Sequence, residues 1–284
     1  MHMATKKAAT TIKKTTVGKT AAVKTSKTTV TTAPVAATKN TFAGHFQQSV
    51  RSITLWRALA AELIGTFLLA GVVIAGQGQP IFVLFALVGI VLTIGAISGA
   101  HVNPAITIGA LVTRRIGWLR AIGYIIAQIL GAALAYVVLN AFIGGAAEVS
   151  AEAAAYGQTA ATLYTAADVS LLTGKEWYVF FAELTGTAIL GFALANATRE
   201  LQDRVAAAFT VGLGIFIGLM IAISAASYVG ATAIINPALA ITLHAYSWGS
   251  IWPFAIYALA PVIGAILGFV IYDALRGRNV PAVK

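Results

Sequence analysis

The tripeptide Asn-Pro-Ala occurs twice in the sequence, as Asn103-Pro104-Ala105 and as Asn236-Pro237-Ala238. Asparagine is a favoured N-cap, and proline is favoured at the first helical position, where its missing N–H costs nothing. Each tripeptide therefore predicts the start of a helix. If the side-chain oxygen of each asparagine caps its own helix, the NH2 group remains as a hydrogen-bond donor for a passing water or hydroxyl oxygen.

Few other residues could do chemistry. Glu62 and Glu183 lie inside long apolar segments, where a carboxylate is costly and suggests a functional or structural role. The sequence has no cysteine, and its four histidines are far apart, without the spacing of a metal site. It shows no nucleophile–base pair and no phosphate-binding loop. We therefore predict that the protein is not an enzyme and needs no cofactor or metal.

The composition indicates a chain that is surrounded mainly by lipid. Of the 284 residues, 59% are hydrophobic and 10% are charged, whereas a soluble domain has about 25% charged residues. Two short apolar segments, 102–112 and 235–245, begin at the tripeptides and are too short to cross a bilayer. Six longer segments approach or exceed the roughly 20 residues that a crossing helix needs, at about 58–76, 80–98, 120–142, 178–197, 206–227 and 251–272.

An internal repeat relates the two halves of the chain. The segment Ala-Glu-Leu-Ile-Gly-Thr at 61–66 reappears as Ala-Glu-Leu-Thr-Gly-Thr at 182–187, each in the first span of its half. Because each half has three spans, the two repeats must lie in the membrane with opposite orientation. The two short helices then start near the bilayer midplane, where their positive N-terminal ends repel cations. We predict an all-α membrane protein with six transmembrane helices and two re-entrant half-helices in an inverted repeat.

Residues 1–50 form a separate region, which contains eight lysines, no acidic residue and otherwise mostly Thr, Ala and Val. This composition predicts a disordered tail. Its lysines could contact anionic lipid or nucleic acid, and we favour lipid over nucleic acid. With the N-terminus in the cytoplasm, 18 of the 19 basic residues fall on the inner side, and only Lys175 lies outside. This bias predicts a multi-pass protein of the cell membrane with both termini cytoplasmic.

The stretch Ser-Gly-Ala-His-Val-Asn-Pro-Ala-Ile-Thr at 98–107 closely matches the first signature of the aquaporin, or major intrinsic protein, family. The chain resembles this family over about residues 55–275. The resemblance implies a channel domain at 51–278, with repeats at about 55–142 and 178–275, a pore through each subunit and a homotetramer. It also implies that Glu62 and Glu183 accept backbone N–H bonds from the re-entrant loops, and that His101 lines the pore.

The sequence departs from the family pattern directly after the second tripeptide. Most members have an arginine there, which forms the outer selectivity filter with three other side chains, but this chain has Leu239. Gap-free counting from the two asparagines places the other filter positions at Val83, Ser224 and Ala233. This set contains no charge, aromatic ring or histidine, so it favours solutes with an apolar face, such as glycerol-like polyols.

The sequence therefore predicts a passive channel for water and small uncharged solutes. A water-selective aquaporin is one alternative. A secondary transporter is an alternative of another class, because inverted repeats with broken helices also build transporters. The only candidates for its ion or proton site are Glu62 and Glu183. A further alternative is a tethering protein that acts through residues 1–50.

Overall fold

The computed structural model describes residues 47, 50–146, 149–160, 162–199 and 203–277. Most of the predicted tail therefore lies outside the described residues, which contain no strand. Six of their helices are long and apolar enough to cross a membrane: α2 (Ile53–Ala75), α3 (Pro80–Ser98), α5 (Trp118–Gly144), α7 (Glu176–Ala197), α8 (Arg204–Ser227) and the continuous helix of α10 (Trp252–Phe254), η2 (Ala255–Leu259) and α11 (Ala260–Arg276). All six predicted spans are confirmed, with their ends shifted by a few residues.

The outer surface of this bundle is apolar. Along α5, the side chains of Ile122, Ile126, Leu130 and Leu134 follow at every fourth position and are between 46% and 55% exposed. In water, such a stripe would be a large unfavourable patch. In a bilayer, hydrocarbon chains cover it at no cost, which agrees with the low charge of the sequence.

The two halves pack in the same way, as an inverted repeat requires. Helix α2 lies against α3 and α5, and α7 lies against α8 and α11. A Cβ atom added at Gly131 of α5 would lie 2.2 Å from the carbonyl oxygen of Leu63, and one added at Gly264 of α11 would lie 2.2 Å from that of Leu184. Only glycine permits this approach, and it brings the first and third spans of each half into direct backbone contact.

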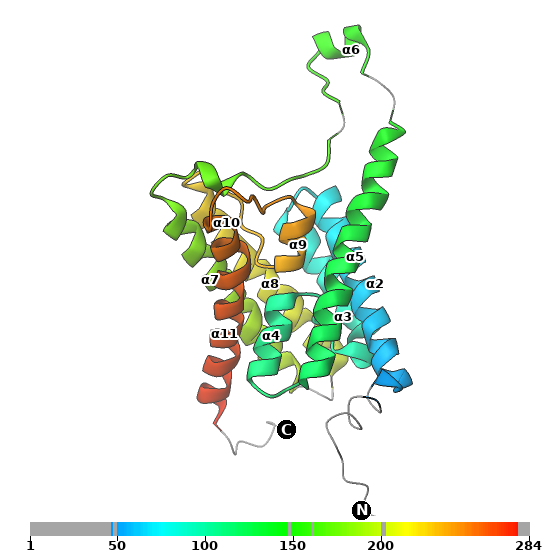
Figure 1. Ribbon diagram of the computed structural model, residues 1–284, viewed down its shortest axis with the longest axis vertical. Coiled ribbons are helices and arrows are strands. Elements are labelled where there is room, and N and C mark those ends of the chain that lie inside the picture. Colours follow the sequence, from blue (N-terminus) through cyan, green and yellow to red (C-terminus); the bar gives the residue numbers. More distant parts are fainter. Residues whose placement is uncertain (1–46, 48–49, 147–148, 161, 200–202, 278–284) are drawn as a thin grey trace, which may run out of the picture. The chain divides into compact units, whose positions relative to one another are not determined.

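The two short helices lie between the halves. These are α4 (Pro104–Val112) and α9 (Pro237–Thr242), and Figure 1 shows them one above the other between α5 and α11. Each begins at the proline of its tripeptide, and the preceding asparagine caps it. The side-chain oxygen of Asn103 accepts from the N–H of Ala105 at 2.9 Å, and that of Asn236 accepts from the N–H of Ala238 at 3.0 Å.

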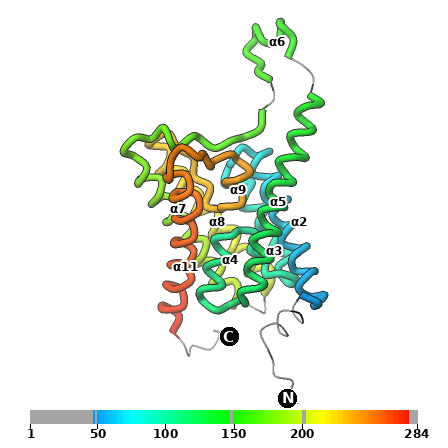
Figure 2. The backbone as a smooth tube through the Cα atoms, viewed as in Figure 1, coloured from blue at the N-terminus to red at the C-terminus, as the bar shows by residue number. Residues whose placement is uncertain are grey.

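The long connection from α5 to α7 returns to the bundle beside α9. It contains α6 (Ala151–Ala155) and η1 (Val169–Leu171), and Figure 2 shows its later part passing next to α9. The N–H of Ala166 donates to the carbonyl oxygen of Leu243 at 2.8 Å, and the side chain of Val169 is fully buried. The carboxylate of Asp168 caps η1, and its hydrogen bonds with Ser170 hold its pKa below the usual range. This part of the connection is thus a fixed rim above the second half-helix.

Candidate functional site

The two asparagines bind each other's loops. The Nδ2 atom of Asn103 donates to the carbonyl oxygen of Ile235 at 2.9 Å, and that of Asn236 donates to the carbonyl oxygen of Val102 at 2.9 Å. Each NH2 group has two hydrogens, so one holds the opposite loop and one remains for a solute. The sequence predicted that the whole NH2 group is available to a solute, but one of its hydrogens is used within the protein. Asn103 and Asn236 are each only 2% exposed.

The residue before each asparagine has an unusual backbone. Val102 has a φ of +40° and Ile235 has a φ of +51°. Side chains branched at Cβ rarely adopt positive φ, and such a conformation costs about 1–3 kcal/mol. The carbonyl groups of these same two residues accept the asparagine bonds. The surrounding hydrogen bonds therefore have to hold both loops in a conformation that their sequence disfavours.

Glu62 supplies part of that support in the first half. Its Oε1 atom accepts the N–H of His101 at 2.9 Å, and its Oε2 atom accepts the N–H of Val102 at 2.7 Å. Oε2 also accepts from Nε2 of Gln128 at 2.7 Å. The carboxylate is fully buried, so these three donors replace the water that it loses.

Glu183 makes the corresponding bonds in the second half. Its two oxygens accept the N–H groups of Ile234 at 2.5 Å and of Ile235 at 2.8 Å. If Gly131 and Gly264 are taken as equivalent, the counterpart of Gln128 is Pro261, which cannot donate. Pro261 also lacks the backbone N–H that would continue the helical hydrogen bonds, and the helix has a wider, π-helical turn at η2, which ends two residues before it. The second carboxylate therefore has one donor fewer than the first.

A narrow cavity runs between the two asparagines. Its volume is about 10 Å³, which is about the space that one water molecule needs. Aliphatic side chains from α2, α3, α7 and α8 form most of its wall, including Leu69, Leu87, Leu190 and Ile215. The side chains of His101, Asn103 and Asn236 are its polar part. Nδ1 of His101 lies 3.2 Å from Oγ1 of Thr107, and its ring meets the edge of Tyr124 at 5.4 Å.

Three of the four predicted filter residues are buried in one hydrophobic cluster. Val83 is 2% exposed, Ala233 is 5% exposed and Leu239 is 3% exposed. Ser224 is not with them, because its residue is exposed. It follows Ile215 by nine residues, which is two and a half turns of helix, so it lies on the opposite face from a residue that lines the narrow cavity.

Leu219, Ala222 and Ala226 of α8 share a face with Ile215, and all three are buried in the same cluster. They follow Ile215 by four, seven and eleven residues, or about one, two and three turns. The gap-free count from Asn236 crosses the non-helical segment 228–236, and a difference in the length of such a segment shifts the count along α8. Ser224 therefore lies outside the buried face of α8, whereas Leu219, Ala222 and Ala226 lie on it.

The comparisons with known proteins agree with this geometry. Residues 79–272 match the family model of the major intrinsic proteins. A relative in Lactiplantibacillus plantarum, named glycerol uptake facilitator protein-like 6, is 33% identical over 74% of this chain and 94% of its own length. The lens fiber major intrinsic protein of Ovis aries is 31% identical over 83% of this chain and 87% of its own.

The chain belongs to the major intrinsic protein family. A further relative, aquaporin NIP1-1 of Zea mays, is 30% identical over 82% of this chain and 79% of its own. The X-ray structure of the aquaglyceroporin from Plasmodium falciparum shares the fold, with a TM-score of 0.56 over 77% of this chain and 96% of that one, at 21% identity. This major intrinsic protein is therefore a multi-pass membrane channel and not an enzyme.

One end of the channel holds most of its arginines, and we call it the basic end: Arg114, Arg115, Arg199, Arg204 and Arg276. Arg115 joins α4 to α7 and α11, because it donates to Asp273 at 2.7 Å and to Oγ1 of Thr198 at 2.9 Å. Burial lowers the pKa of Arg115, and the charge of Asp273 opposes that shift. The two halves are thus fastened to each other at this end as well.

A wider cavity of about 350 Å³ opens at the basic end. Leu194 and Val211 line both this cavity and the narrow one, so the two cavities are adjacent. Arg204 also lines the wider cavity, and its Nη2 atom donates to the carbonyl oxygen of Leu92 at 2.8 Å. The sequence alone does not indicate this position of Arg204, because nothing in the local pattern shows that the start of α8 borders the cavity.

The bonds of Glu62 lead to a direct prediction about this major intrinsic protein. Glu62→Leu should lower the thermal stability in detergent strongly, because it leaves the N–H groups of His101 and Val102 without an acceptor, at about 1–3 kcal/mol for each buried donor. Glu62→Gln should be milder, since it keeps an acceptor oxygen. Thermal unfolding of both variants beside the wild type measures the difference. If Glu62→Gln were as stable as the wild type but inactive, Glu62 would be a proton-relay residue.

Proposed function

We propose that this channel passes glycerol-like polyols as well as water. The observation that carries the proposal is the uncharged outer filter, in which Leu239 stands where most members have arginine. Val83 and Ala233, with a buried residue of α8 such as Ala222 or Ala226, complete a filter without a charge or an aromatic ring. Such a wall is wider than one with aromatic rings and offers an apolar surface to the carbon side of a polyol. The name of the Lactiplantibacillus plantarum relative supports the same class of solute.

Selection against ions then falls to the asparagine pair. The N-terminal ends of α4 and α9 each carry about half a positive charge, and both point at the narrow cavity. A neutral solute accepts a hydrogen bond from the free amide hydrogen of Asn103 or Asn236. A cation meets two positive helix ends in a space that strips its water shell, so it is excluded. In this proposal, Glu62 and Glu183 hold the loops and carry no protons.

A water-selective channel is the second candidate. The observation in its favour is the size of the narrow cavity, which has room for about one water molecule. The two candidates differ in which constriction controls the flux. If the filter at Leu239 controls it, polyols pass, whereas control by the space between the asparagines favours water.

Stopped-flow light scattering on proteoliposomes separates the candidates, with parallel runs in water, glycerol and urea. We expect glycerol permeability well above that of protein-free liposomes, without saturation and without dependence on a proton gradient. Fast water flux with glycerol at the control level would favour the water-selective channel. Saturable flux that follows a proton gradient would favour a secondary transporter.

The predicted orientation and assembly form part of the proposal. Helix α2 begins at the basic end, and α11 ends there (Figure 1). Lys175 lies at the other end of the bundle, at the start of α7. These positions support a channel domain at 51–278 in the cell membrane, with both termini cytoplasmic and the basic end inside. The family supports a homotetramer with one pore in each subunit.

Deleting residues 1–46 should leave the flux of water and glycerol per channel unchanged. The residues that line the narrow cavity belong to the channel domain, and the deletion keeps Val50, whose carbonyl oxygen accepts from the indole of Trp56 at 2.7 Å. Stopped-flow measurements at matched protein density test this. A loss of flux with normal membrane insertion would show that the tail takes part in conduction or assembly.

A further inference from the structure

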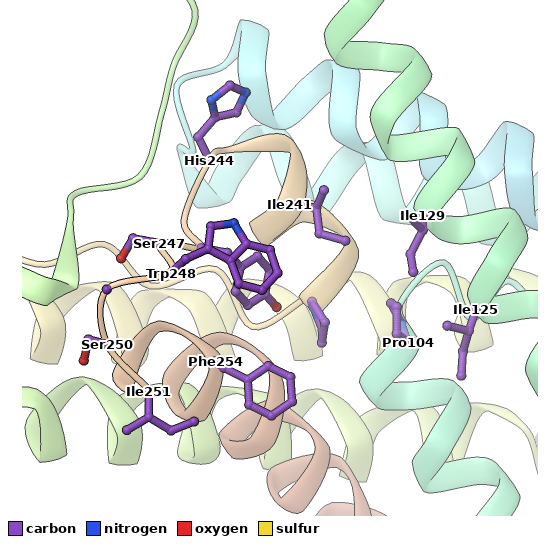
Figure 3. A pocket seen from close by; sticks show the side chains of 13 residues that line it. Pro104, Ile125, Ile129, Ile241, His244, Ser247, Trp248, Ser250, Ile251 and Phe254 are labelled. Atoms are coloured by element: carbon purple, nitrogen blue, oxygen red, sulfur yellow. The ribbon is translucent and has the colours of Figure 1, made fainter.

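A second large cavity lies on the outside of the bundle, between α5 on one side and α9 and α10 on the other. Its volume is about 1200 Å³, above the ~300–1,000 Å³ of an ordinary ligand pocket. Figure 3 shows Ile125 and Ile129 of α5 facing Phe254 and Ile251 across this groove. Its lining contains no Asp, Glu, Lys or Arg.

The groove reaches the centre of the channel from outside. Pro104 and Pro237, the first residues of the two half-helices, both line it. Figure 3 shows Pro104 beside Ile125, at the inner side of the groove. An occupant would therefore touch the back of the same turns whose front forms the narrow cavity.

The outer end of the groove is polar and aromatic. The loop 246–250 lines it, and Trp248 is fully exposed there. Trp177 and Trp252, which pack edge to face at 5.0 Å, lie at the starts of α7 and α10 at the same end of the bundle. Tryptophans gather at the boundary between membrane and water, so this end of the groove lies at the level of lipid headgroups.

We propose that the groove binds one acyl chain of a membrane phospholipid, with its headgroup end beside the loop 246–250 and its tail along Ile125 and Ile129 toward Pro104 and Pro237. The polar outer end and the apolar inner walls match the two parts of such a molecule in order and depth. Next to Ile125, Ile126 is exposed on the outer face of α5, so the groove opens toward the bilayer. The proposal does not depend on which solute the channel passes.

Quenching of Trp248 fluorescence tests the proposal. In a variant with Phe at the other four tryptophans, detergent-solubilised protein is titrated with a phospholipid that carries bromine atoms on one acyl chain. We expect saturable quenching. Ile125→Phe combined with Ile129→Phe fills the groove and should weaken the apparent affinity at least about tenfold. Ile126→Phe, on the exposed face of the same helix, is the matched control and should have no effect.

Native mass spectrometry gives an independent measurement without removing tryptophans. The wild-type channel should retain one more phospholipid per protomer than the variant that combines Ile125→Phe and Ile129→Phe. Quenching that rises linearly with lipid, equally in filled and control variants, would mean that the groove holds only bulk lipid and would overturn the proposal. A lower oligomer mass in the filled variant with unchanged lipid retention would assign the groove to a second copy of the chain.

Discussion

Leu239→Arg should lower glycerol permeability about tenfold while reducing water permeability much less. A tenfold change corresponds to about 1.4 kcal/mol in the barrier. In the proposed filter, this buried leucine, only 3% exposed, forms an apolar wall. An arginine in the same place narrows the opening, and its N–H donors replace part of the hydration shell of a water molecule. Stopped-flow measurements of both solutes on one proteoliposome preparation give the ratio directly.

Leu239→Met is the matched control, because it conserves volume and adds no charge. It should keep the wild-type ratio of glycerol to water permeability. Circular dichroism and gel filtration check that the arginine variant is folded. Equal losses of water and glycerol flux in a folded Leu239→Arg channel would show that this residue does not set the selectivity.

Asn103→Asp and Asn236→Asp should each damage both stability and cation exclusion. Aspartate caps a helix about as well as asparagine, so the half-helices keep their caps. The bond across the site is lost, because a carboxylate oxygen replaces the amide that donates to Ile235 or Val102 at 2.9 Å. An unpaired buried carbonyl costs about 1–3 kcal/mol, and the new negative charge opposes the positive helix ends. We expect a lower unfolding temperature and a measurable proton or sodium leak.

Asn196→Asp is the control for this pair. Asn196 is an exposed residue near the end of α7, and its Oδ1 atom accepts from the hydroxyl of Tyr272 at 3.0 Å. Aspartate keeps that acceptor, so this variant should be as stable and as cation-tight as the wild type. Ion flux is followed with a pH-sensitive dye under a potassium gradient. Normal stability and cation exclusion in both site variants would contradict the role given to the asparagine pair.

The features that were predictable from the sequence are those set by local chemistry. The caps at Asn103 and Asn236 follow from residue preferences at the first turn of a helix, and the six spans follow from hydrophobic length. The inverted repeat follows from the matching segments around Glu62 and Glu183. In each case, neighbours within a few residues determine the outcome, so one sequence is enough.

The features that were not predictable depend on contacts between distant segments. The bond from Asn103 ends on a residue 132 positions later in the chain, and no local pattern indicates that partner. Ser224 was placed by a gap-free count through the segment 228–236, and the length of such a non-helical segment has no fixed relation to the face of α8 that packs inward. The positive φ angles of Val102 and Ile235 oppose the usual preference of their side chains, and only the surrounding hydrogen bonds explain them.

The crossed bonds between the two loops also set an order of events during biosynthesis. A ribosome delivers Asn103 well before Ile235, because 132 residues separate them, and chains generally fold from the N-terminal part first during synthesis. The first half-helix can be capped by its own asparagine as soon as it emerges. The carbonyl oxygen of Val102, however, has no partner until the ribosome has made Asn236, whose side-chain amide donates to it. The first half thus remains an unfinished intermediate in the translocation machinery until the last third of the chain arrives, and both loops then close in one step.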